Sequence, residues 1–102
     1  MKDSLRKKLK EISEKHLEIE KSLSDQKIIN DLEKYKNLSV EYAKLELIVK
    51  DYKNYLESEE ALKDSEEISK SASGDLKKLA DDEVKLAREN IEQLEKNLQI
   101  SL

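Results

Sequence analysis

The sequence predicts an all-α fold, an elongated antiparallel three-helix bundle or coiled-coil hairpin with a long central helix. Three observations predict it. The 102 residues include no proline and one glycine, so the chain has few positions that break a helix. Only 36% of the residues are hydrophobic and 43% are charged, which suits helices with a narrow apolar stripe. Apolar residues also recur at spacings of three and four along most of the chain.

The first helix is predicted over residues 3–23, where Asp3 or Ser4 can cap its start. His16 occupies the one stripe position in this segment that is not apolar, and we expect it to lie at the edge of the stripe. The alternation of three and four residues is typical of a coiled coil. The other stripe positions are Leu5, Leu9, Ile12, Ile19 and Leu23.

The central helix is predicted over residues 27–70, after a turn at "SLSDQ" in which Ser24 or Asp25 can accept from free amides. The sequence leaves open whether this helix bends near Asn37 to Ser39, where both polar side chains compete for backbone hydrogen bonds. The predicted stripe is Ile28, Leu32, Tyr35, Leu38, Tyr42, Leu45, Val49, Tyr52 and Leu56.

The third helix is predicted over residues 75–101, after a second turn at "SKSASGD". Gly74 is the one residue there that adopts a left-handed conformation without strain, and Asp75 can cap the helix. Leu79 and Leu86 widen one edge of its stripe. The stripe itself is Leu76, Ala80, Val84, Ala87, Ile91, Leu94 and Leu98.

All four aromatic residues of the chain are tyrosines, and they lie between residues 35 and 55. Both turns are short, so each outer helix folds back on the central one, and the outer helices overlap only near its middle. We therefore predict that Tyr42 and Val49 are largely buried. Tyr35 and Tyr52 also fall on the stripe, whereas Tyr55 lies beside it and is either core or an interface anchor.

Composition gives little support for catalysis. The chain has no cysteine and one histidine, so a metal site built from the usual His and Cys ligands cannot be assembled. A phosphate-binding glycine loop is also excluded by the single glycine. We expect no enzyme activity, no catalytic, cofactor or metal site, and no small-molecule ligand. The net charge of −4 gives no general attraction to nucleic acid, and no apolar run is long enough to cross a membrane.

One stretch of the sequence resembles a known family. "DLEKYKNLSVEYAKLELIVKDYKNY", residues 31–55, is similar to the N-terminal domain of bacterial class I peptide chain release factors, in particular the factor that reads UAA and UAG. The segment "DLKKLADDEV", residues 75–84, resembles a further part of that domain. The sequence departs from the family pattern in its turns, with Gln26 in place of a frequent proline and Ser-Gly at the second turn.

The resemblance implies a single helical domain, residues 1–102, from the N-terminal part of a larger multidomain factor. It implies docking to the ribosome near the stalk base, against ribosomal protein L11 and nearby RNA, in the cytoplasm. The remaining release-factor domains and a recycling GTPase factor are further implied partners. The family's Gly-Gly-Gln and codon-reading motifs are absent from this chain, so the implied role is positioning and not catalysis.

Within this interpretation, the second turn is the candidate ribosome contact, with Lys70, Gly74, Lys77 and Lys78 as its residues. The alternative is that these lysines only keep the helix ends soluble. A different function also fits the pattern, a free-standing coiled-coil adaptor or oligomerisation protein whose stripes pair between chains. A helical arm that binds transfer RNA fits less well, because such an arm needs two helices of similar length and a basic stripe.

Overall fold

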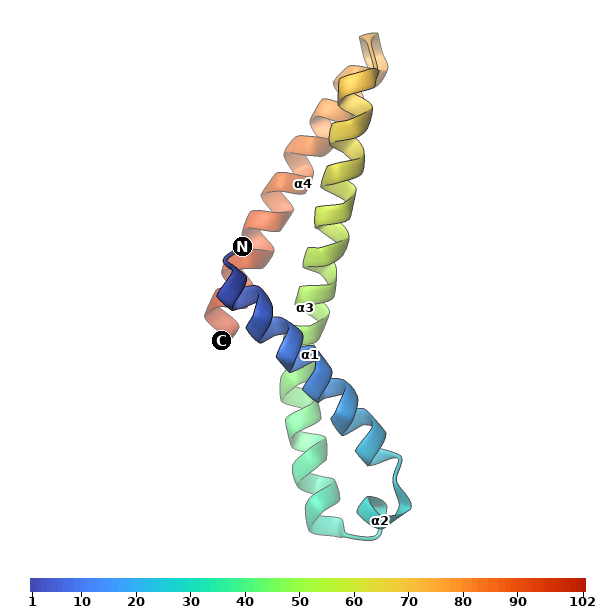
Figure 1. Ribbon diagram of the computed structural model, residues 1–102, viewed down its shortest axis with the longest axis vertical. Helices are drawn as coiled ribbons and strands as arrows, with labels where there is room; N and C mark the ends of the chain where they lie inside the picture. Colours follow the sequence, from blue (N-terminus) through green and yellow to red (C-terminus); the bar gives the residue numbers. More distant parts are fainter. The chain divides into compact units, whose positions relative to one another are not determined.

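The computed structural model describes residues 1–102 and contains four helices and no strands. The helices are α1 (Asp3–Leu23), α2 (Gln26–Ile29), α3 (Leu32–Ser71) and α4 (Gly74–Ser101), as Figure 1 shows. The predicted all-α fold with a long central helix is confirmed. None of the helices combines the length and the apolar character that a membrane span requires.

The predicted boundaries hold for α1 and differ by one residue at the start of α4. The predicted central helix from residue 27 was wrong at its start, because the chain forms the short α2 and then breaks at Asn30 and Asp31. Asp31 caps the start of α3, since its Oδ1 accepts from the Lys34 amide at 3.2 Å and its carbonyl accepts from the Tyr35 amide. Residues 37–39, where the sequence left a bend open, are uninterrupted helix.

The sequence predicts a capping residue for the starts of three helices, and one of the three has the predicted cap. Asp25 caps α2 as predicted, with Oδ1 accepting from the Lys27 amide at 2.9 Å. The N-cap residues of α1 and α4 are Lys2 and Ser73, and neither side chain makes a capping hydrogen bond. Asp3 and Asp75 lie in the first turns instead, where a negative charge is favourable beside the helix N-terminus.

The chain forms two compact units, unit 1 (Met1–Lys50) and unit 2 (Asp51–Leu102). In unit 1, α1 runs antiparallel to the part of α3 that belongs to it, and Leu9 and Ile19 are buried. Tyr42 and Val49 are half-buried, so the prediction that they are largely buried was wrong in degree.

Two other predicted stripe residues of unit 1 are exposed and do not lie in its core. Leu32 is 81% exposed and Tyr35 is also exposed, although the predicted stripe placed both in the core. That stripe assumed one continuous helix from Ile28 onward. Because the helix breaks at Asn30 and Asp31, the face set by Ile28 does not continue into α3.

In unit 2, α3 and α4 lie side by side and run in opposite directions (Figure 1). Their least exposed positions repeat at spacings of three and four, which is the pattern of an antiparallel coiled coil. We call these positions the seam. The α3 seam is Tyr55, Ser58, Leu62, Ser65 and Ser69, and the α4 seam is Ala80, Val84, Ala87, Ile91, Leu94 and Leu98.

The seam corrects three expectations. Tyr55, expected beside the stripe, is 2% exposed and is the largest fully buried side chain. Leu56, expected on the stripe, is exposed, because the buried positions pass from Tyr52 to Tyr55 to Ser58 at successive spacings of three. Leu76 is exposed as well, since the spacing of α4 places Lys77 and not Leu76 in register with Ala80 and Val84. The seams of α3 and α4 pack against each other within one chain and not between two chains.

Candidate interaction surface

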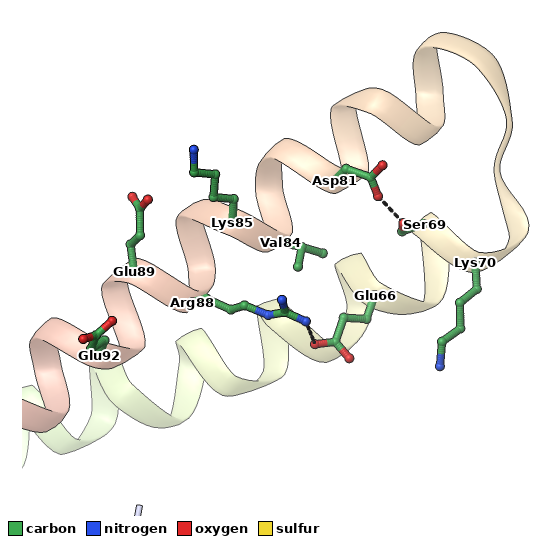
Figure 2. Close-up of a pocket in the computed structure, with 9 residues that line it drawn as sticks. All are labelled: Glu66, Ser69, Lys70, Asp81, Val84, Lys85, Arg88, Glu89 and Glu92. Atoms are coloured by element: carbon green, nitrogen blue, oxygen red, sulfur yellow. Dashed lines mark hydrogen bonds and ion pairs between the residues drawn. The ribbon is translucent and has the colours of Figure 1, made fainter.

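One side of the unit 2 hairpin carries paired charges, and we call it the charged side. Arg88 reaches from α4 toward Glu66 of α3, with Nη2 at 3.5 Å from Oε1 (Figure 2). A groove of about 550 Å³ runs along this side. Its lining residues are Glu66, Ser69 and Lys70 from α3 and Asp81, Val84, Lys85, Arg88, Glu89 and Glu92 from α4.

Two of the three serines in the α3 seam donate hydrogen bonds to acidic side chains of α4. Ser65 is buried, and its hydroxyl donates to Glu83 Oε2 at 3.3 Å. Ser69 donates in the same way to Asp81. These bonds allow serines to occupy a coiled-coil seam, because a buried hydroxyl without a partner would destabilise the fold.

Lys77 connects α4 to α3 near the turn of the hairpin. Its Nζ donates to the Ser69 carbonyl and hydroxyl, each at 3.4 Å, and lies 3.6 Å from Asp81 Oδ2. The Ser69 hydroxyl bond lowers the pKa of Asp81, and the nearby Lys77 charge lowers it further. Asp81 on the charged side is therefore a carboxylate that already contacts two partners, Ser69 and Lys77.

The structure gives the four predicted contact residues different roles. Gly74 is the first residue of α4 and has φ +64°, the left-handed conformation that the sequence predicted. Lys77 is engaged within the hairpin, as described above. Lys70 and Lys78 are exposed on either side of the turn, and Lys70 extends away from Asp81 in Figure 2. The turn thus offers two uncommitted cations to a partner.

Sequence reasoning missed the contacts of unit 1. His16, expected only to edge the stripe, stacks on Tyr42 with ring centroids 4.3 Å apart and an interplanar angle of 18°. The buried Nε2 of His16 has no hydrogen-bond partner. Beside this stack, Lys15 pairs with Glu41 at 2.8 Å. The signal was present in the sequence, because His16 occupies a stripe position of α1 and Tyr42 one of α3.

Charge and burial shift two pKa values in unit 1. Burial raises the pKa of Tyr42, and the nearby carboxylates of Glu20 and Glu46 raise it further. The hydrogen bond and charge of Glu41 raise the pKa of Lys15. Both shifts favour the protonated form of the side chain, so each group keeps its proton to a higher pH than it would in the unfolded chain.

A family model decides the identity of the chain. The model of the PCRF domain, the peptide chain release factor domain, matches residues 12–102. The chain belongs to the PCRF-domain family. Both segments whose sequence resembles release factors, residues 31–55 and 75–84, lie inside the matched range of this PCRF domain. No solved structure matches the chain.

The match places this PCRF domain in translation termination as a helical domain of a release factor. Its parts are those described above, with α1 from residue 12, α2, α3 and α4 all in the matched range. The charged side and the turn of unit 2 can offer ion pairs and hydrogen bonds to another macromolecule. That is the chemistry of a surface that binds and orients a partner.

Proposed function

We propose that this PCRF domain is the N-terminal, non-catalytic domain of a class I release factor that reads UAA and UAG in the cytoplasm. It docks the factor to the ribosome near the stalk base, against protein L11 and nearby RNA. The remaining release-factor domains read the codon and release the peptide, and a recycling GTPase factor is a further partner. The single observation that carries the proposal is the family match over residues 12–102.

The geometry of unit 2 supports the turn between α3 and α4 as the contact. Lys70 and Lys78 flank this turn and are exposed, so they can pair with phosphate or carboxylate groups at no cost to the hairpin. Lys77 supports the turn from within, through Ser69 and Asp81. The proposal therefore assigns contact to Lys70 and Lys78 and a positioning role to Lys77 and Gly74.

Co-sedimentation of the chain with purified ribosomes tests the proposal. We expect the double variant Lys70→Glu with Lys78→Glu to bind ribosomes at least tenfold more weakly than the wild type. Lys77 is left unchanged, because a glutamate there would face Asp81 and disturb the turn itself. Circular dichroism of the variant confirms that the helices persist.

A matched control makes the same change of charge elsewhere on the hairpin. Lys53→Glu with Lys63→Glu alters the net charge equally but leaves the turn intact, and its ribosome affinity should stay within about twofold of the wild type. Equal weakening by both double variants would show a general charge effect and remove the turn as the contact. A wild-type chain that fails to sediment with ribosomes would contradict docking by this domain.

A further inference from the structure

The side of unit 2 opposite the charged side carries exposed apolar residues. Leu76, Leu79 and Leu86 of α4 are 58%, 57% and 61% exposed, and Ile68 of α3 is 44% exposed. We call these four residues the apolar strip. Leu86 lines a groove of about 250 Å³ between the two helices, together with Ala61 of α3.

Helix periodicity places the other members of the apolar strip on this same side. Leu79 precedes Leu86 by seven residues, and Ile68 follows Ala61 by seven, so each pair shares one face of its helix. Leu76 lies one turn before Leu79 on α4. A row of three leucines on α4 thus lies beside an isoleucine and an alanine on α3.

The charges around the apolar strip are all of one sign. The positions three and four residues from Leu79 are Asp75, Leu76, Asp82 and Glu83, and those around Leu86 are Asp82, Glu83, Glu89 and Asn90. The corresponding positions around Ile68 are Asp64, Ser65, Ser71 and Ala72. No lysine or arginine occupies any of these neighbouring positions, whereas Lys70, Lys85 and Arg88 line the groove of the charged side.

We propose that the apolar strip is a docking site for a basic amphipathic helix of a protein partner. Apolar side chains of such a helix would cover Leu79 and Leu86, and its lysines and arginines would pair with the acidic rim. From Leu76 to Leu86 the strip is ~15 Å long, so a helix of about three turns covers it. The inference goes beyond ribosome docking through the turn and does not depend on it.

The acidic rim also selects against other occupants. A second copy of this chain would bring the same carboxylates against Asp82 and Glu83, and like charges at close range oppose such an interface. RNA and an anionic membrane would be repelled in the same way. An acidic rim around exposed leucines therefore fits a positively charged protein helix best.

Binding of a synthetic peptide tests the inference directly. The probe is a helical peptide of about 18 residues with leucines at positions i, i+3, i+4 and i+7 and lysines elsewhere, which carries a fluorescent label. We expect saturable binding to the chain, with amide shifts in its NMR spectrum centred on residues 76–90. Affinity should fall with rising salt, because charged contacts contribute to it.

Two variants locate the site on the chain. Leu79→Ser with Leu86→Ser should weaken peptide binding at least tenfold, and circular dichroism shows whether the helices persist. Both leucines are mostly exposed, so these substitutions leave the seam intact. Leu47→Ser is the control, because Leu47 is an exposed leucine of unit 1 outside the strip, and it should leave the affinity unchanged.

Three results would overturn the inference. One is equally tight binding of a scrambled peptide with the same composition, which would show that only charge matters. Another is amide shifts centred outside residues 76–90, or no binding at all. The third is a concentration-dependent dimer in sedimentation that Leu79→Ser with Leu86→Ser abolishes, because the strip would then be covered by a second copy.

Discussion

Unit 1 and unit 2 both fold an antiparallel helix pair from sequences of similar composition, but different contacts hold each pair together. In unit 1 the buried Leu9 and Ile19 lie on the stripe of α1, and His16 stacks on Tyr42 of α3 beside the Lys15 to Glu41 ion pair. In unit 2 a regular seam runs along α3 from Tyr55 and along α4 from Ala80, and acidic residues of α4 accept hydrogen bonds from Ser65 and Ser69. Both pairs therefore have an apolar stripe, and they differ in their polar contacts, an aromatic stack with an ion pair in unit 1 and hydrogen bonds from serines to carboxylates in unit 2.

The largest effect should come from the tyrosine of the seam. Tyr55→Ala should lower the free energy of unfolding by about 3–5 kcal/mol, because Tyr55 is almost completely buried and its loss leaves a cavity. Tyr42→Ala should cost only about 1–2 kcal/mol, since Tyr42 is half-buried and loses chiefly its stacking contact. Urea unfolding followed by circular dichroism measures both, and equal costs would erase this difference between the units.

A smaller effect, of opposite sign, is expected at the other partner of the stack. His16→Phe keeps a ring against Tyr42 and removes the buried Nε2 that has no partner. We expect it to stabilise the chain by about 1 kcal/mol, because an unpaired buried polar atom is unfavourable. His16→Ala, which removes the ring, should destabilise it. If His16→Phe also destabilises the chain, the nitrogen has a favourable role that the stack does not explain.

The pH dependence of stability should differ between the units. The pKa of Asp81 is lowered in the folded chain, so its contribution is present above its unfolded pKa and is lost as the pH falls through the folded value. The pKa of Tyr42 is raised, so its contribution is present below its unfolded pKa of about 10 and is lost as the pH rises through the folded value.

Thermal unfolding at a series of pH values measures both contributions. Asp81→Asn should reduce the dependence on pH in the acid range and leave the alkaline range unchanged. Tyr42→Phe should reduce the dependence on pH in the alkaline range and leave the acid range unchanged. Lys15, whose pKa is raised by its contact with Glu41, still titrates at high pH in this variant. A variant that altered both ranges would show that the two sites are not independent.

The sequence predicted most of the fold, and its errors have identifiable causes. It predicted the bounds of α1 from the apolar stripe, and it predicted the conformation of Gly74 because a lone glycine in a turn is a local signal. It missed the break before α3, although Asp31 is a good cap, because the spacing of Ile28, Leu32 and Tyr35 also fits one continuous helix. It also misplaced Tyr55, since one continued stripe cannot reveal a change in spacing at Tyr52.

The candidate surface was harder to predict than the fold. Lys70, Lys77 and Lys78 have the same charge and lie near the same turn, yet only contacts across the hairpin show that Lys77 is engaged with Ser69 and Asp81. The exposure of Leu76 likewise depends on which residues of α4 meet α3. Such pairings between helices cannot be derived from the periodicity of either helix alone.

We propose that the turn of unit 2, and not the turn of unit 1, contacts the ribosome. The chain has no cysteine, so one introduced cysteine carries a photo-crosslinker to a single place. Ser73→Cys labels the turn of unit 2 and Ser24→Cys labels the turn after α1, and neither side chain makes a capping hydrogen bond. With purified ribosomes, we predict a crosslink from position 73 and none from position 24. A crosslink from position 24 alone, or from neither position, would contradict a ribosome contact at the turn of unit 2.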